Sequence, residues 1–214
     1  MNKRIVLSCI CCLFSILLQA QTEHLKFMGI PLDGNINAFD KELKKKGFEL
    51  DPYSGKMLDG TYIYNGVFSG ETAQILVFYD NRTKNVYQAA VIIKCYTKTI
   101  AVRKYQDIRD MLEEKYSQDE AVKFYNDLNA EHGEEMKKDG LNLFEWKHTE
   151  EKDGYETTLF LIPNLRDREF RGIIEVSVSE TFSNVTYCTD YNLYIKYSDW
   201  KNENLHRENA IDDL

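Results

Sequence analysis

The sequence predicts an α+β fold in which helices pack on one face of an antiparallel sheet. Three observations lead to it. Apolar residues recur at helical spacing in two separate blocks, within residues 36–43 and 100–116. Runs of β-branched and aromatic residues follow each block. Short turn signals separate these runs, so neighbouring strands are expected to pair as antiparallel hairpins. Helix plus four strands thus occurs twice, which suggests a tandem α-β4 duplication.

The first 20 residues predict a secretory signal peptide. Lys3 and Arg4 open the chain, an uncharged apolar run covers residues 5–18, and Ala20 marks the onset of polar sequence, where we expect cleavage. The alternatives are a lipid anchor on Cys9 and an uncleaved membrane anchor, for which the run is short. The mature chain is therefore expected to be exported, periplasmic or extracellular, with no stable insertion in a membrane.

The composition is that of an ordinary globular protein with an acidic surface. Of 214 residues, 43% are hydrophobic and 29% are charged, and the formal net charge is −8. A nucleic-acid partner would need a basic face, and so would adhesion to anionic lipid. The charge therefore argues against both partners.

The stretch 27–50 carries the clearest local sequence signals for secondary structure. Asn35 or Asn37 can cap a helix, and Gly47 is expected to end it in the left-handed conformation. The apolar face of this helix consists of Ile36, Phe39 and Leu43. The Gly47 stop would place Phe48 against the last of these residues.

The first unit, residues 21–99, continues with four predicted strands. They cover residues 48–53, 57–68, 73–79 and 86–96. In the segment 73–79 both alternating sets of side chains are largely apolar, which places this strand inside the sheet.

The second unit, residues 100–198, is expected to pack with the first as one globular domain. Its helix over residues 100–116 is followed by a second helix that begins at Ser117–Glu120, and by a short helical piece between Gly133 and Gly140. The four strands of this unit are expected at residues 141–148, 155–162, 170–180 and 185–197. Residues 199–214 are predicted to form a loose polar tail.

Two cysteines, Cys95 and Cys188, are left after removal of the signal peptide. In an oxidising compartment they could form a disulfide, which would constrain the unfolded chain. The alternative is two buried thiols on strands.

No residue pattern points to a catalytic, cofactor or metal site. The four histidines lack metal-ligand spacing, and neither a nucleophile elbow nor a phosphate-binding glycine loop occurs. His148 is the only histidine on a predicted strand, and a hydrolase would have to use it or carboxylates. The carboxylates considered for this role are Glu145, Glu156 and Glu175.

Tyrosine is the one compositional excess, with 14 residues. Its rigid apolar ring and polar tip suit interfaces, and it is also a good strand former. We predict that Tyr62, Tyr64, Tyr191 and Tyr194 contact a partner, with plain sheet packing as the alternative.

Three motifs carry a resemblance to known proteins. Leu25–Gly34 reads L-K-F-M-G-I-P-L-D-G, an F-x-x-x-L helix follows at Phe39–Leu43, and K-Y occurs at Lys115-Tyr116. With the signal peptide, these motifs resemble exported proteins of unknown function from Gram-negative gut anaerobes. The repeated helix-plus-four-strands order is similar to the architecture of β-lactamase inhibitor protein and its relatives, and more weakly to small envelope-assembly lipoproteins. The resemblance implies a binding function, and no functional residue carries over from it.

We therefore expect an exported, non-enzymatic binding protein, with an inhibitor-like protein as one form of it. Its partner is expected to be a protein, a peptide or a glycan of the cell envelope. The alternatives are a periplasmic hydrolase and a structural component of the envelope.

Overall fold

The fold is taken from a computed structural model of the chain. It describes residues 24–54, 59–138, 145–152, 154–164, 170–183 and 188–212. The predicted signal peptide lies outside the described residues. No helix in the described part of the chain combines the length and the apolar character needed to cross a membrane.

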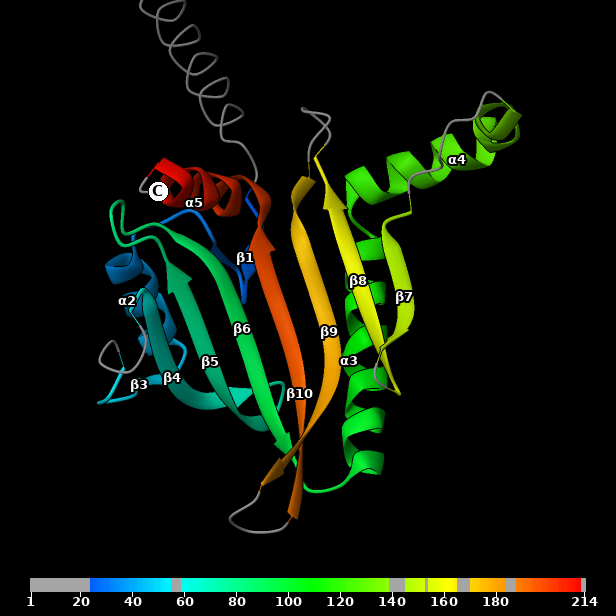
Figure 1. Cartoon of the computed structure of the whole chain (residues 1–214). Coiled ribbons are helices and arrows are strands. Elements are labelled where there is room, and N and C mark those ends of the chain that lie inside the picture. The colour runs from blue at the N-terminus through cyan, green and yellow to red at the C-terminus, as the bar shows by residue number, and fades with distance from the viewer. Residues whose placement is uncertain are drawn as a thin grey trace, which may run out of the picture.

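The described residues form helices and strands in an α+β arrangement (Figure 1). The helices are α2 (Ile36–Lys45), α3 (Lys98–Ser117), α4 (Glu120–Lys138) and α5 (Trp200–Asp212). The strands are β1 (Lys26–Phe27), β2 (Ile30–Pro31), β3 (Glu49–Leu50), β4 (Thr61–Phe68), β5 (Glu71–Tyr79), β6 (Val86–Cys95), β7 (Lys147–Lys152), β8 (Tyr155–Pro163), β9 (Phe170–Ser183) and β10 (Cys188–Asp199). The predicted fold class is confirmed.

Eight strands form one sheet in the order β3-β4-β5-β6-β10-β9-β8-β7, and every neighbouring pair is antiparallel. The last strand of each predicted unit, β6 and β10, pair at the centre of the sheet. The strand order is therefore mirrored about the β6·β10 pair, as two α-β4 units joined through their last strands would be. The tandem duplication itself stays a prediction.

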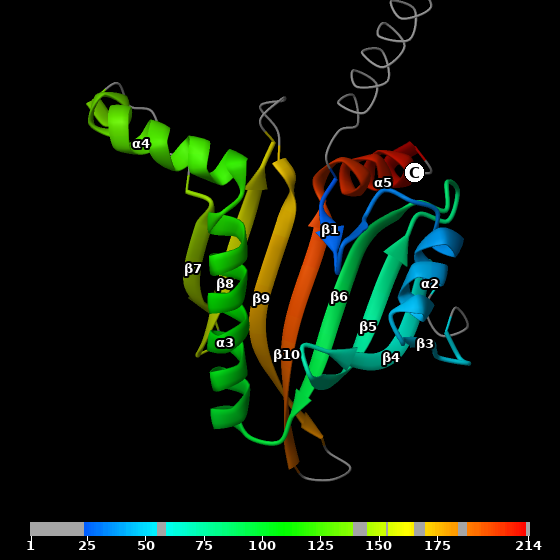
Figure 2. The ribbon, with the colours of Figure 1, turned by 180° about the vertical axis from the view of Figure 1, so that it is seen from behind.

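Helices α2 and α3 cover the same face of the sheet (Figure 2). One register row crosses the sheet through Tyr64, Ile75, Val91, Ile195, Val176 and Thr158. At one end of this row, the Tyr64 hydroxyl donates a hydrogen bond to Asp40 on α2. At the other end, the Thr158 hydroxyl is 2.7 Å from the hydroxyl of Tyr105 on α3. Because directly paired residues point to the same side of a sheet, both helices lie on one face.

The apolar core lies between this face and the two helices. Phe27 is fully buried, and its ring contacts the rings of Phe39 on α2, Phe68 on β4 and Tyr197 on β10, with centroids 5.2–6.5 Å apart. Burial of a phenylalanine side chain contributes about 1.5–3 kcal/mol. Through Phe27, the β1–β2 hairpin, which was missing from the predicted elements, joins the first helix to the central strands.

The predicted start and end signals of α2 are both confirmed. The Asn35 side chain caps the helix by accepting a hydrogen bond from the backbone N–H of Asn37 at 3.0 Å. Gly47 has φ +87°, and its N–H donates to the carbonyl of Lys44. The N–H of Phe48 donates to the carbonyl of Leu43, and both side chains are buried. This pair of hydrogen bonds is the Schellman arrangement that the glycine stop predicts.

Several element boundaries differ from the prediction. Helix α4 runs without interruption through Gly133, because one glycine costs a helix only about 1 kcal/mol. Strand β3 is limited to two residues, and β4 begins at Thr61. Strand β7 begins at Lys147; most of the predicted strand 141–148 lies outside the described residues.

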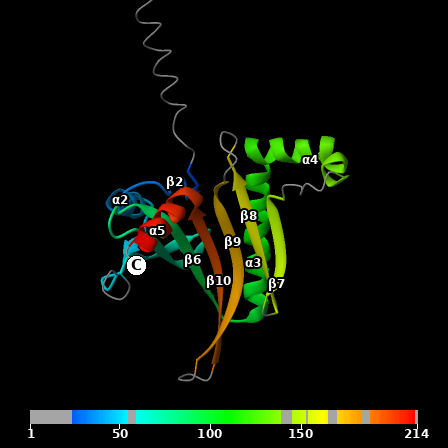
Figure 3. The ribbon, with the colours of Figure 1, turned by 45° about the horizontal axis from the view of Figure 1, so that its top comes forward.

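The predicted loose tail at 199–214 is wrong, because residues Trp200–Asp212 form helix α5 across the ends of β6 and β10 (Figure 3). Asp199 precedes the helix, and its Oδ1 accepts a hydrogen bond from the N–H of Asn202 at 3.0 Å. The Asn202 amide in turn donates to the carbonyl of Leu32 at 2.6 Å. A polar helix is thus held by polar contacts, which an apolar-periodicity argument does not detect.

The N-terminal segment and α5 meet at a buried carboxylate. Asp199 is fully buried, and its Oδ2 lies 3.0 Å from Nδ1 of His24 and accepts the N–H of Leu25 at 3.1 Å. The hydrogen bond to Asp199 raises the pKa of His24 above its usual value, although burial opposes the shift.

This pair predicts a pH-dependent stability. A histidine whose pKa is raised by folding contributes fully below its unfolded value, and the contribution is lost as the pH rises through the folded pKa. We expect the gap in free energy of unfolding between wild type and His24→Gln to be largest near about pH 6 and to shrink toward about pH 8. Chemical denaturation at each pH measures it.

The matched control is the same substitution in an Asp199→Asn background. There the gap should not depend on pH, because the charge that holds the imidazolium is absent. A gap that grows with pH in the wild-type background would contradict the assignment.

Gly172 on β9 predicts a second stability effect. A Cβ at this position would collide with the backbone oxygen of Ser198 on β10 and would lie 2.9 Å from the Leu25 side chain. Gly172→Ala should therefore lower the free energy of unfolding by about 1–3 kcal/mol. Gly34→Ala is the control, because a Cβ there meets no atom within 4 Å. Equal stability of the two variants in urea unfolding would refute the close packing at Gly172.

Candidate functional site

The second face of the sheet has no helical layer over its centre in the described part of the chain. Helices α2 and α3 lie behind the sheet in the view of Figure 1, and only α5 crosses the strand ends on the near side. We call this surface the open face. It is formed by the side chains that alternate with the core residues along β4–β10.

Three register rows make up the central part of the open face. The first consists of Asn65, Gln74, Ile92, Tyr194, Ser177, Thr157 and Glu150. The second consists of Ile63, Leu76, Ala90, Lys196, Glu175, Leu159 and His148. The third consists of Thr61, Phe78, Gln88, Ser198, Ile173 and Leu161.

The central part of the open face is apolar and poor in charge. Its large apolar side chains are all partly exposed, and they are Ile63, Leu76, Phe78, Ile92, Leu159, Leu161, Ile173 and Tyr194. Of the described side chains in the three rows, only Lys196, Glu175 and Glu150 carry a full charge. Two of them neutralise each other, because Lys196 Nζ lies 2.5 Å from a Glu175 carboxylate oxygen. An antiparallel sheet with one solvated face normally alternates apolar inside with polar outside, and this face departs from that pattern.

A hollow of about 580 Å³ indents the open face over β7–β9. Its lining includes Thr157, Leu159, Ser177, Glu150 and Glu175. This part of the open face is therefore concave as well as apolar.

The four tyrosines predicted to contact a partner do not share a surface. Tyr194 lies on the open face, directly between Ile92 and Ser177 in the strand register. Tyr64 is fully buried beneath α2, so it cannot contact a partner while the domain stays folded. Tyr62 and Tyr191 are partly buried and pack against the core on the helix-covered face. The positions of Tyr64, Tyr62 and Tyr191 therefore fit the alternative interpretation, in which these tyrosines pack within the fold.

The residues considered for hydrolysis do not converge. His148 is exposed on the edge strand β7, and Leu159 on β8 separates it from Glu175 on β9. Two strand spacings put these side chains roughly 10 Å apart. Glu156 lies on the helix-covered face, 3.6 Å from Arg109 of α3, and Glu145 is exposed before β7.

Cys95 is buried, and its Sγ donates to the carbonyl of Ile93 at 3.7 Å. Burial raises the pKa of this thiol. The register of β6 and β10 places Tyr191 opposite Cys95. The side chain of Cys188 lies outside the described residues, so the disulfide stays an untested prediction.

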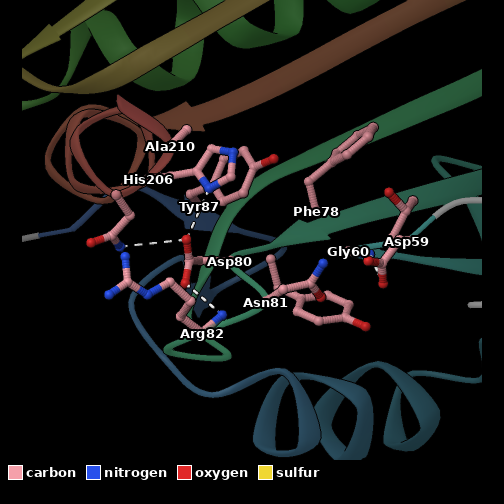
Figure 4. Close-up of a pocket in the computed structure, with 12 residues that line it drawn as sticks. Asp59, Gly60, Phe78, Asp80, Asn81, Arg82, Tyr87, His206 and Ala210 are labelled. Carbon is pink, nitrogen blue, oxygen red and sulfur yellow. Dashed lines mark hydrogen bonds and ion pairs between the residues drawn. The ribbon is translucent and has the colours of Figure 1, made fainter. Parts of the chain in front are cut away.

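A pocket of about 400 Å³ continues the third row of the open face, between the β5–β6 turn and α5 (Figure 4). The register of β5 and β6 shifts after Phe78, which leaves Tyr87 as an extra residue on β6. The Tyr87 ring stacks on the ring of His206 from α5, with centroids 4.4 Å apart and planes at 10°. The ring centroids of Phe78 and Tyr87 are 6.5 Å apart, so the rings of Phe78, Tyr87 and His206 form one wall of the pocket.

Asp80 fixes the shape of this pocket. It is buried, and its Oδ1 accepts hydrogen bonds from the backbone N–H groups of Arg82 and Thr83 and from the Thr83 hydroxyl. Its Oδ2 lies 3.0 Å from Nδ1 of His206. Burial alone would raise the pKa of Asp80, but the hydrogen bonds from Thr83, His206 and Arg82 outweigh it and lower the pKa.

Sequence reasoning missed most of this site. The prediction that the segment 73–79 lies inside the sheet is confirmed, because β5 lies between β4 and β6. The apolar residues on its second face were not predicted to form a partly exposed surface. His206 was placed in a loose tail, and its partner Asp80 lies 126 residues away in the chain. No local sequence signal connects two such residues.

In the described part of the chain, no three His, Cys, Asp or Glu side chains gather into a group that could hold a metal ion. Comparison with protein-family models, curated proteins and solved structures finds no significant match. The geometry of the open face and its pocket is therefore the basis for a functional proposal.

Proposed function

We propose that this chain is an exported, non-enzymatic protein that binds another protein through the open face. Inhibition of an enzyme is one form that such binding can take. The main observation behind this proposal is a large set of apolar side chains, exemplified by Leu76, Phe78 and Ile92, on a sheet face whose centre no described helix covers. A contiguous exposed apolar surface is the mark of an interaction site.

The composition of the open face supports a protein as the partner. The core of a protein interface is depleted in charged residues and enriched in aromatic ones, and it carries hydrogen-bonding groups among the apolar contacts. Tyr194 at the centre is flanked by Ile92 and Ser177 and lies among amides and hydroxyls. The residual charges of Lys196 and Glu175 already pair with each other, so their burial does not leave an isolated charge.

A hydrolase has weaker support. A catalytic pair needs two titratable groups within hydrogen-bond reach of a common substrate position. His148 and Glu175 lie on alternate strands, and Glu156 lies on the other face of the sheet. No observation favours this second function.

Tyr194→Ala should weaken binding of the partner by about tenfold or more, because central tyrosines contribute strongly to interfaces. The mature protein, immobilised, is used to capture proteins from an envelope extract, and the dissociation constant is then measured with the purified partner. Circular dichroism checks that the variant stays folded.

Tyr96→Ala is the matched control, because Tyr96 is 87% exposed and lies in the bend between β6 and α3, outside the three register rows of the open face. It should bind like wild type. Recovery of no protein by the wild-type bait, or equal loss of binding in both variants, would count against the open face as the binding surface.

A further inference from the structure

The pocket between the β5–β6 turn and α5 is held in a fixed shape before any ligand arrives. Asp80 joins its two walls, because it accepts hydrogen bonds from its own turn with one oxygen and contacts His206 on α5 with the other. Its volume of about 400 Å³ lies within the range of roughly 300–1,000 Å³ that is usual for small-molecule sites. The pocket is therefore preorganised, which lowers the cost of binding.

The contact with Asp80 also orients His206. When Nδ1 carries the proton that is shared with Asp80, the opposite ring nitrogen, Nε2, is a hydrogen-bond acceptor. The side chain of His206 is 36% exposed, and its ring is fixed by the stack on Tyr87. A ligand hydroxyl can therefore donate to Nε2.

Polar groups surround the aromatic wall. Figure 4 shows the Tyr87–His206 stack and Asp59 on opposite sides of the space, with Phe78 and Asn81 between them. The Asp59 carboxylate accepts hydrogen bonds, and the amide of Asn81 both donates and accepts them. Phe78 is partly exposed and offers a flat apolar surface.

We propose that this pocket binds a neutral saccharide unit, with one face of the sugar ring on Phe78 and its hydroxyls on His206, Asp59 and Asn81. A sugar ring has an apolar C–H face and a rim of hydroxyls that donate and accept, which matches one aromatic surface among acceptors and an amide. Carboxylates of Asp59 and Asp80 disfavour an anionic ligand. Arg82 in the same lining offsets one of these two negative charges.

This inference is separate from the proposed function, because it concerns a small ligand and is tested with sugars, although the pocket shares Thr61 and Phe78 with the third row of the open face. The test titrates the isotope-labelled mature protein with neutral monosaccharides and disaccharides, and with uronic acids for comparison, by NMR. A neutral sugar should shift the amide signals of residues 59–61, 78–82 and 206–210, with a dissociation constant of about 1 mM or below.

Phe78→Ala and Asp59→Asn should each weaken this binding by about tenfold. Asp59 is exposed, so its variant tests the site even if Phe78→Ala disturbs the fold. Tyr96→Ala should bind the sugar like wild type. No neutral sugar bound by the wild type, stronger binding of uronic acids, or unchanged binding by Asp59→Asn would overturn the proposal. None of these results affects protein capture by the open face.

Discussion

The structure depends on a mismatch between an eight-stranded sheet with two apolar faces and helices that cover only one of them. The inner face is packed by α2 and α3 over residues such as Ile75 and Val91. The outer face presents Leu76 and Ile92 at the alternate positions of the same strands. Folding requires the first set. The outer set meets no packing helix at the centre of the sheet in the described part of the chain. Its apolar character is therefore the feature that points to a partner.

Polar contacts, together with aromatic contacts such as Phe170–Trp200, attach the elements at the rim of the sheet. Asp199 connects His24 to the start of α5, and Asp80 connects the β5–β6 turn to His206 in the same helix. Both carboxylates are buried, and each accepts several hydrogen bonds, which makes such buried groups stable in the folded state. The same polar contacts that hold α5 also shape the pocket beside the open face. Local stability and a candidate ligand site thus share one set of residues.

The sequence predicted those parts of the fold that are encoded locally. The Asn35 cap, the Gly47 stop and the strand periodicities depend on residues a few positions apart, and they were found. Helix α5 was missed, because its contacts to Leu32 and Asp80 come from distant segments. The candidate site was found only in part. Tyr194 lies on the open face, whereas Tyr64 is buried under α2, since residue type alone does not say to which side of a strand a tyrosine points.

The central claim is that the apolar side chains of the open face are not needed for folding. Ile92 and Ile93 are neighbours on β6 and point to opposite faces. The most direct measurement compares the free energies of unfolding of Ile92→Ala and Ile93→Ala in urea. Loss of the buried Ile93 side chain should cost about 2–5 kcal/mol, and loss of Ile92 should cost about 1 kcal/mol or less. Equal large losses would mean that both faces serve folding, and would contradict the account.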